Sequence, residues 1–393
     1  MRQCLDDVSV SAAIAALLAV IVSYAGSAVI IFQAARLSGL SPELTSSWIW
    51  AVSIGSGLAG LFLSWRMKVP VITAWSTPGA ALLVAMLPGI PFAEAIGAYL
   101  ASAAIITAIG LTGTLDAMMR RIPAGVCSGM FAGILFSFGA RVFASIPLDP
   151  LLALPMLGAF VVCRRFSPRY AVMAVMFTGM LIAGLSGGMQ VADLHVALAT
   201  PVFTFPSWSV SAIVSVGVPL ALVTLTGQYI SGMAVLHASG YRVPSNGIMT
   251  VTGIFSLLLA PFGSHAINLS SLTAAICTGS EAHEDPARRY VAGMICGGLY
   301  VAIGLFGTTL IALFASLPAV FIAVLAGLAL ISAFTAGIAG VVKDAAHLEA
   351  GIVAFLATAS GIEFLGLGAP FWGLFLGGAT CFLSKKPAAK PAH

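Results

Sequence analysis

Two copies of one short sequence decide the fold: Ala108-Ile-Gly-Leu-Thr-Gly-Thr114 and, 194 residues later, Ala302-Ile-Gly-Leu-Phe-Gly-Thr308, which share six of seven residues. At the same offset, Ser76-Thr-Pro-Gly-Ala-Ala81 lies opposite Ser270-Ser-Leu-Thr-Ala-Ala275. An offset of 201 residues aligns Val22-Ser23, Gly26 and Ser38-Gly39 with Val223-Thr224, Gly227 and Ser239-Gly240. Because these matches fall in one order at nearly one offset, they predict an internal repeat with halves 1–200 and 201–393.

The composition around these copies is that of a membrane protein. Apolar residues make up 60% of the 393 residues and charged residues only 8%, against roughly 25% charged in a soluble domain. The charges separate continuous apolar runs of about 20 residues, which is long enough to cross a hydrocarbon layer about 30 Å thick. A membrane barrel would show alternating segments of about ten residues instead. The sequence therefore predicts an all-α polytopic membrane protein without a soluble domain.

Charged and Pro/Gly-rich breaks divide the chain into about fourteen spans. Of the seventeen Lys and Arg residues, fifteen fall in alternate connecting segments, and only Arg36 and Arg141 fall in the others. Since basic residues collect on the cytoplasmic side, both termini are predicted to be cytoplasmic. The first apolar run has full spanning length and no cleavage pattern, so it is not interpreted as a signal peptide. The expected spans are 12–35, 44–64, 70–87, 92–119, 123–145, 151–163 and 170–189, then 210–236, 247–262, 263–278, 290–314, 318–342, 346–359 and 364–383.

Seven spans in each half force the second half to run upside down, an inverted repeat typical of secondary transporters. In such folds the substrate lies near the midplane, beside discontinuous helices. The third and tenth spans are the expected broken pair: Val69-Pro-Val-Ile-Thr-Ala-Trp75 favours extended backbone, and half-helices are expected from Pro78 and Ser271. Two helix N-termini at the site would favour an anion. The candidate binding residues on this pair are Thr73, Trp75, Ser76, Thr77, Gly79, Ser264, His265, Asn268, Ser270 and Ser271.

His265 is the ionisable side chain expected in the broken spans. The acidic residues closest to span centres, Glu94, Asp116, Glu349 and Glu363, fall at predicted span ends, which argues against sodium coupling through carboxylates. Histidine titrates near neutral pH, so His265 is the candidate for proton coupling. The alternative is a neutral His265 that donates to a backbone carbonyl, as broken helices require.

Other polar and aromatic residues extend the candidate site. Gln228, Tyr229 and Ser231 of the eighth span are expected to face the broken pair, or else to join helices. Tyr24 and Trp75 offer rings that stack on a planar substrate, or else pack within the protein. The arginine pairs at 120–121, 164–165 and 288–289 are interpreted as topology anchors. Six scattered cysteines show no metal or redox spacing, so no metal and no cofactor are expected.

Three runs carry a family resemblance. Thr73-Ala-Trp-Ser-Thr-Pro-Gly79, Gly263-Ser-His-Ala-Ile-Asn-Leu-Ser-Ser-Leu-Thr-Ala-Ala-Ile-Cys277 and Glu281-Ala-His-Glu-Asp-Pro-Ala-Arg-Arg-Tyr290 resemble the benzoate:proton symporter (BenE) family. The resemblance implies uptake of benzoate with a proton across the bacterial inner membrane. More remotely, the chain resembles uracil/xanthine permeases and sulfate-type anion transporters. That fold implies a core domain, 12–119 and 210–314, and a gate domain, 123–189 and 318–383. Nucleobase members carry glutamates on spans eight and ten, where this chain has Gly227, Gln228 and Asn268.

The leading hypothesis is a benzoate/H⁺ symporter in which the core moves against the gate, with the ring in an apolar slot and the carboxylate at the two half-helix N-termini. The alternatives are a transporter of another small organic anion or a nucleobase-like heterocycle, or an anion channel. An enzyme is not expected, since His283 and Glu284 lack a second histidine at metal-ligand spacing. The expected partners are an aromatic acid, a proton and the lipid bilayer, with a homodimer left open and no nucleic acid.

Overall fold

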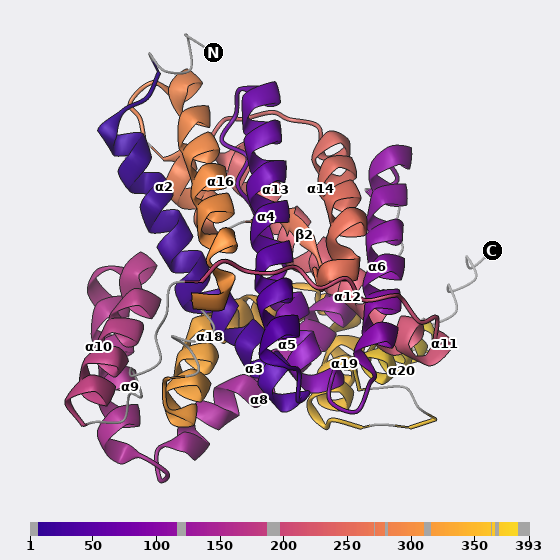
Figure 1. Cartoon of the computed structure of the whole chain (residues 1–393). Helices are drawn as coiled ribbons and strands as arrows, with labels where there is room; N and C mark the ends of the chain where they lie inside the picture. The colour runs from indigo at the N-terminus through magenta and orange to yellow at the C-terminus, as the bar shows by residue number, and fades with distance from the viewer. Residues whose placement is uncertain are drawn as a thin grey trace.

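The computed structural model describes residues 7–115, 123–186, 197–270, 272–279, 282–309, 316–362, 364–365 and 369–383. Helices dominate these ranges (Figure 1). In the first half they are α2 (Val10–Ser23), α3 (Val29–Leu37), α4 (Pro42–Met67), α5 (Thr77–Met86), α6 (Phe92–Thr112), α8 (Ala124–Ser145), α9 (Pro150–Phe166) and α10 (Ala171–Leu185). A π-helical turn, η1 (Tyr24–Ala28), joins α2 to α3, and a short 3₁₀ turn, η2 (Pro168–Tyr170), precedes α10.

The second half holds a second series of helices. Its eighth span is one helical run made of α11 (Val210–Ala212), η3 (Ile213–Gly217), α12 (Val218–Thr224), η4 (Leu225–Tyr229) and α13 (Ile230–Ala238), where η3 and η4 are π-helical. The remaining helices are α14 (Ser245–Leu259), α15 (Leu272–Thr278), α16 (Tyr290–Leu305), α18 (Ala319–Lys343), α19 (Leu348–Ala359) and α20 (Ala369–Leu383), with the 3₁₀ turns η5 (Ala260–Phe262), η6 (Pro286–Arg288) and η7 (Ala345–His347). Every predicted span thus contains a helix.

Local sequence sets where several helices begin. Ser41, Ser76 and Asp149 precede α4, α5 and α9, and each side chain accepts a hydrogen bond from the backbone N–H three residues later. Each of these caps is followed within two residues by a proline. This combination of a polar N-cap and an early proline is a strong start signal for a helix.

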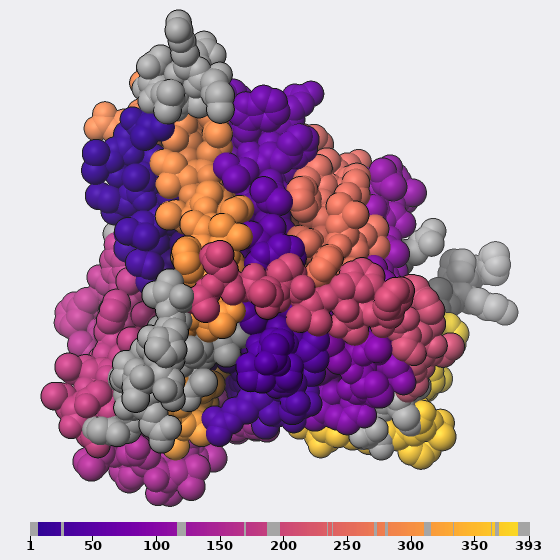
Figure 2. Space-filling view, viewed as in Figure 1, coloured from indigo at the N-terminus to yellow at the C-terminus, as the bar shows by residue number. Residues whose placement is uncertain are grey.

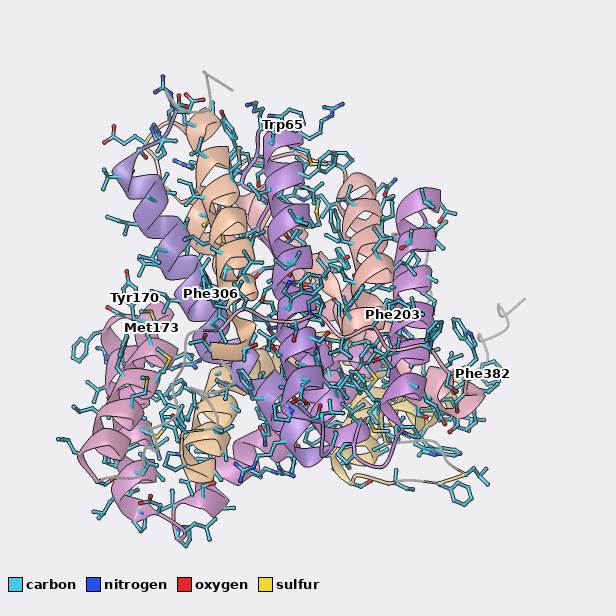
Figure 3. The ribbon with its side chains drawn as sticks, viewed as in Figure 1. Trp65, Tyr170, Met173, Phe203, Phe306 and Phe382 are labelled. Atoms are coloured by element: carbon cyan, nitrogen blue, oxygen red, sulfur yellow. The ribbon has the colours of Figure 1, made fainter. Side chains whose placement is uncertain are left out.

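The outer surface suits a bilayer. Six described helical stretches are long and apolar enough to cross a membrane. Large apolar side chains point outward from the protein, such as Trp65 and Phe382, which are 52% and 78% exposed (Figure 3). Lipid rather than water satisfies such a surface. The six stretches are Pro42–Met67, Phe92–Thr112, Ala124–Ser145, Val210–His237, Ser245–Phe262 and Ala319–Lys343.

The helices form two groups. In one, α4 packs along α16 and α14 packs along α6. In the other, α8 packs against α18, α19 and α20, and α9 packs against α10. Figure 1 shows α2, α4, α14 and α16 of the first group above α8, α9 and α19 of the second, with α3 and α5 of the first group beside the second. We call them the core group (spans 1–4 and 8–11) and the gate group (spans 5–7 and 12–14), and each contains helices from both halves of the chain.

The broken spans meet in a buried antiparallel ribbon at the heart of the core group. Strand β1 (Thr73–Trp75) pairs with β2 (Ile267–Leu269), with Ala74 opposite Asn268. The two strands begin 194 residues apart, the offset found in the sequence. Two further hydrogen bonds extend the ribbon, from Ser76 N–H to the Ala266 carbonyl (3.1 Å) and from Ser270 N–H to the Ile72 carbonyl (2.9 Å). The extended segments expected in spans three and ten are therefore present.

The 201-residue offset also appears in the backbone. The π-helical turns η1 and η4 begin at Tyr24 and Leu225. Gly39 and Gly240 follow the ends of these two spans, and both have positive φ, +63° and +88°. A left-handed glycine just past a helix end is the usual way to stop a helix. Local structure as well as sequence is therefore repeated in spans one and eight.

An extended segment, 197–209, joins the halves by crossing the core group. Its N–H groups at Ala199, Thr204 and Ser207 donate to the carbonyls of Leu305, Pro261 and Ala93, at 2.8, 2.8 and 2.9 Å. Figure 2 shows this rose-coloured segment lying over the surface of the core helices. It contacts three core spans, so it fastens their ends together as well as linking the repeats.

Candidate substrate site

A cavity of about 550 Å³ lies between the core and gate groups. Its volume falls within the range of roughly 300–1,000 Å³ that small-molecule sites occupy. The core contributes the π-helical turns η1 and η4, the ribbon and the starts of α5 and α15, and the gate contributes α8, α10 and α18. Among the described residues that line the cavity, none is Asp, Glu, Lys, Arg or His. The polar or aromatic residues in its wall are Ser23, Ser27, Trp75, Thr77, Ser128, Phe131, Thr226, Gln228, Ser231, Ser270, Thr273 and Ser332.

The N-terminus of α5 reaches this cavity at Thr77. Pro78 has no N–H, and the N–H groups of Gly79 and Ala80 already donate to the Ser76 hydroxyl (3.0 Å) and carbonyl (2.8 Å). A first-turn N–H has no acceptor within its own helix, so Thr77 keeps the available backbone donor. The Thr77 hydroxyl bonds to Ser27 Oγ across the core (2.6 Å). This helix end therefore offers one backbone donor to a ligand.

Gln228 supplies the amide of the site. It sits in η4, is 9% exposed and lines the cavity. Its side chain makes no hydrogen bond to any residue in the described part of the chain. Its neighbour Tyr229 is buried on the other side, where its hydroxyl bonds to Thr252 Oγ1 (2.6 Å). The π-helical turn thus directs a free carboxamide toward the cavity, and π-turns inside helices are frequent at functional sites.

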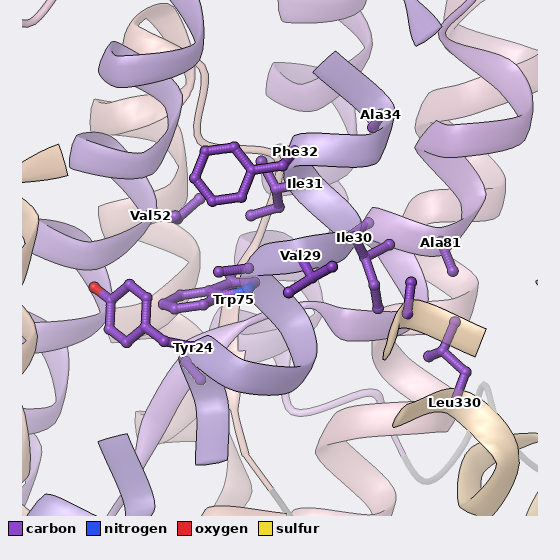
Figure 4. Close-up of a cluster of buried hydrophobic side chains, with 14 of the residues drawn as sticks. Tyr24, Val29, Ile30, Ile31, Phe32, Ala34, Val52, Trp75, Ala81 and Leu330 are labelled. Atoms are coloured by element: carbon purple, nitrogen blue, oxygen red, sulfur yellow. The ribbon is translucent and has the colours of Figure 1, made fainter. Parts of the chain in front are cut away.

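Aromatic rings stiffen the wall at Trp75. The ring of Tyr24 lies edge-on to Trp75 with centroids 5.1 Å apart (Figure 4). Tyr300 contacts Trp75 in the same way at 5.7 Å and donates its hydroxyl to Ser23. The Tyr24 hydroxyl donates to Ser53 Oγ at 2.6 Å. Tyr24 therefore supports Trp75 from behind, whereas Trp75 itself reaches the cavity.

His265 lies behind the ribbon, 1% exposed. The indole Nε1–H of Trp48 donates to His265 Nδ1 (3.1 Å), and His265 Nε2 lies 3.0 Å from the Ser76 carbonyl oxygen. An indole N–H only donates and a carbonyl only accepts, so these contacts assign a neutral ring with its proton on Nε2. In this conformation His265 joins α4 to the turn that begins α5.

The structure separates the predicted site residues into two sets. Trp75, Thr77, Gln228 and Ser270 line the cavity together, as does Ser231. Residues behind the wall hold the ribbon. The Thr73 hydroxyl donates to the Ser56 carbonyl (2.5 Å). With the Asn268 amide oriented so that its NH₂ donates to the Leu269 carbonyl (3.2 Å), its oxygen accepts from Ser76 N–H (2.9 Å). Ser271 lies outside the described residues, as do Arg120 and Arg121. The predicted residues behind the wall are Tyr24, Thr73, Ser76, Gly79, Tyr229, Ser264, His265 and Asn268.

Gly79 illustrates the difference between packing and binding. A Cβ atom on Gly79 would lie 2.5 Å from Leu220 Cδ1 and 2.9 Å from Ser76 Oγ. A Cβ on Gly227 would instead lie 3.1 Å from Pro78 Cγ and 3.9 Å from the Phe131 ring. Gly79 permits α5 to pack on α12, whereas Gly227 lies at the cavity between core and gate.

Sequence reasoning missed the gate wall of the cavity. Cys127, Ser128 and Phe131 from α8 line it, as do Val172 from α10 and Leu330 from α18. No polar pattern distinguishes these residues from ordinary membrane helices. The available signal was the core and gate division implied by the family resemblance, which predicts a site between the two domains.

A second cavity of about 520 Å³ follows the same interface at the opposite ends of the spans. It is lined by the end of α5, the start of α6 with Glu94, and α8 residues between Gly133 and Arg141. Phe131 lines the first cavity and Gly133 the second, so less than one turn of α8 separates them. By the charge distribution this second cavity is predicted to face the periplasm.

Comparison with known proteins now identifies the family. The model of the benzoate membrane transport protein family, BenE, matches residues 6–383. A benzoate membrane transport protein from Acinetobacter baylyi is 43% identical over 98% of both chains. This chain belongs to the BenE family. The inner membrane protein YdcO of Escherichia coli is 39% identical over 94% of each chain. The family prediction made from the sequence is confirmed, and the chain is a membrane transport protein, not an enzyme.

Solved structures place this BenE family member in a known fold. The transmembrane domain of the cyanobacterial bicarbonate transporter BicA has a TM-score of 0.61, with 15% identity over 92% of this chain and 96% of that one. The structure of SLC26A9 has the same TM-score and identity, over 94% of this chain and 64% of that one. At this identity the likeness shows the fold alone. It agrees with the remote resemblance to anion transporters stated above.

Proposed function

We propose that this protein imports benzoate, or a closely related aromatic carboxylate, together with a proton, by movement of the core group against the gate group. The observation that carries the proposal is the cavity between the two groups, with an aromatic wall and a free carboxamide at its polar end. BenE membership supports benzoate as the substrate.

The cavity chemistry matches the two ends of an aromatic acid. Trp75 and Phe131 line it from core and gate; the partly exposed Phe131 offers ring surface for an aromatic substrate, whereas Trp75 is 1% exposed and shapes the wall. At the polar end are the Thr77 N–H, the Gln228 amide and the Ser270 hydroxyl, which accepts a hydrogen bond from Thr273 (2.6 Å) and keeps its own proton. These donors suit a carboxyl group.

The two cavities support alternating access. Both follow the interface between core and gate, at opposite ends of the spans, and less than one helical turn of α8 lies between them. Sliding the core along α8 would carry the ribbon and the start of α5 from one cavity toward the other. We extend the proposal to an inner-membrane location with both termini cytoplasmic, as the distribution of Lys and Arg indicates.

The test is transport by purified protein in proteoliposomes. With a more acidic exterior, radiolabelled benzoate is expected to accumulate above its external concentration, with saturation, and to lose accumulation when a protonophore collapses the gradient. A channel would equilibrate benzoate without uphill accumulation. Unlabelled aromatic acids, other organic anions and nucleobases are then tested as competitors, and those that compete identify the substrate class. If benzoate is not taken up and does not compete with the uptake of any of these compounds, benzoate is removed from the proposal.

The proton has two routes in this proposal. It binds His265, which touches the α5 cap through Ser76, or it enters with the substrate as a neutral pair. Both routes give electroneutral transport of a monoanion, so the uptake experiment alone does not separate them.

A further inference from the structure

We infer that the cavity holds its substrate as the neutral carboxylic acid, paired with the carboxamide of Gln228, so that the transported proton travels on the substrate. This inference rests on the proposed function and deepens it, because it names the protonation state that the site recognises. It makes Gln228 the residue that couples the proton to the acid.

The first observation is the lack of charge in the cavity wall. Among the described lining residues there is no acidic or basic side chain, and the one of an ionisable type is the buried Cys127. A carboxylate that leaves water without a cationic partner is strongly disfavoured, and protonation removes that cost. Arg164 donates to Ser332 Oγ at 3.1 Å, but its guanidinium is not part of the wall and lies over the Phe160 ring.

The second observation is the chemistry of the free group. A primary carboxamide has two N–H donors and an acceptor oxygen on one plane. A neutral carboxyl group carries one O–H donor and one carbonyl acceptor, so the two groups can form a closed pair of hydrogen bonds. A carboxylate only accepts and would leave the Gln228 oxygen facing a negative charge. The free amide therefore matches the acid better than the anion.

Neighbouring hydroxyl groups do not offer the same pairing. Ser231 Oγ already donates to the Gly227 carbonyl (2.6 Å), and Thr226 Oγ1 donates to the Leu222 carbonyl (2.8 Å). Such bonds to the preceding turn use the hydroxyl proton within the helix. Gln228 differs from them because its donor and its acceptor are both unused by the described residues.

The third observation concerns the rival proton carrier. His265 accepts from Trp48 at Nδ1 and faces the Ser76 carbonyl with Nε2–H. A second proton on Nδ1 would break the bond to Trp48 and place a buried cation where no described acid lies within salt-bridge distance. His265 is also absent from the cavity wall. The geometry assigns it to the fold and leaves the proton to the substrate.

The chemical balance is simple. On the acidic side one benzoate and one proton combine to the acid, which binds Gln228, and on the other side the acid leaves and separates into benzoate and a proton. No bond within the protein forms or breaks, and no net charge crosses the membrane. The pH gradient drives accumulation because the bound species is more abundant on the acidic side.

Three ligands that share one phenyl ring test the inference on the wild-type protein: benzoate, benzamide and benzenesulfonate. Benzoate affinity is expected to rise about tenfold for each unit of falling pH, the slope for one linked proton. Benzamide, a neutral donor and acceptor, is expected to compete with no dependence on pH. Benzenesulfonate, which stays an anion, is expected not to compete. Competition by benzenesulfonate but not by benzamide, or benzoate affinity independent of pH, would overturn the inference.

A variant pair locates the effect. Gln228→Leu is expected to weaken benzoate and benzamide alike, by about tenfold or more, since a pair of hydrogen bonds is lost. Gln33→Leu is the matched control, because Gln33 is a buried glutamine outside both cavities, and we expect it to change benzoate affinity by less than about threefold. Equal effects of the two changes would contradict the role of Gln228. If Gln228→Leu does not fold, the ligand series still decides. Failure of wild-type protein to take up benzoate at all would instead remove the proposed function.

Discussion

Substitution of His265 tests whether this residue stabilises the fold or carries the transported proton. Its ring is buried and bonded on both sides, to Trp48 and to the Ser76 carbonyl. Replacing it with alanine leaves the Trp48 N–H buried without an acceptor, which costs about 1–3 kcal/mol. The Ser76 carbonyl keeps its bond from Ala80 N–H. Deleting the ring adds the cost of a core truncation, so we expect His265→Ala to lose about 3–6 kcal/mol of stability in total.

His265→Gln is the matched milder change. Its amide can still donate to the Ser76 carbonyl, so we expect a loss of about 1–3 kcal/mol, mainly from the bond to Trp48. Unfolding of both variants in detergent, induced by denaturant or by heat, measures the loss of stability. Benzoate affinity between about pH 5 and 8, which spans the ordinary histidine pKa of about 6.5, measures coupling in the same samples.

The two roles give opposite patterns. If His265 holds the fold, stability falls and the pH dependence of benzoate affinity keeps the wild-type slope. If His265 carries the proton, the slope flattens in His265→Gln while the protein stays folded and expressed. The second pattern would refute the assignment of His265 to the fold, and with it the inference that the proton travels on the substrate.

Three further predictions follow from the packing and from the charged ends. Gly79→Leu is expected to cost about 1–3 kcal/mol of stability by overpacking against α12 and to lower the folded yield. Gly227→Ala is expected to keep the yield and to weaken benzoate binding in a titration. The reverse pattern would contradict the assignment of Gly79 to packing and of Gly227 to the cavity. Arg289→Gln should reduce monodisperse recovery without changing the affinity of the folded fraction, since its guanidinium bonds the carbonyl that ends α15, and an affinity loss in well-folded protein would reverse this. Arg141→Gln, in the second cavity, should leave the uptake KM and its salt dependence within about twofold of wild type, because a cationic side chain concentrates anions but not a neutral acid; a clear rise in KM for Arg141→Gln but not for Arg36→Gln would show that the anion is the species that enters.

Much of the core was predictable because its signals are local and occur twice. The β-branched run before Trp75 and the proline at 78 predicted an extended half followed by a helix, and β1 and α5 lie there. The repeat offset transferred the prediction to span ten, where β2 precedes α15. A pattern that depends only on neighbouring residues predicts local structure even when the strand with which it pairs is about 194 residues away in the sequence.

The candidate site was less predictable because its geometry depends on contacts between distant segments. The role of His265 is set by Trp48, which is 217 residues away in the sequence. The number of free N–H donors at the start of α5 depends on two hydrogen bonds that Ser76 accepts, one from Gly79 N–H at its hydroxyl and one from Ala80 N–H at its carbonyl. The gate residues at the cavity, such as Phe131, carry no sequence signal of their own. Polarity alone therefore selected two kinds of residue, those that stabilise the ribbon and those that face the cavity.

The change of offset from 201 to 194 residues has a structural explanation in the span between the two matched regions. Span two is the 26-residue helix α4, whereas its counterpart in the second half, Ser245–Phe262, has 18 residues. The helices differ by eight residues and the offset changes by seven, and since both numbers are close to two helical turns, the shorter helix presents nearly the same face to its neighbours. The contacts agree, because α4 packs on α16 while its counterpart α14 packs on α6, the counterpart of α16. Both copies can then enter the ribbon in matching register, which a change of five or nine residues would not allow.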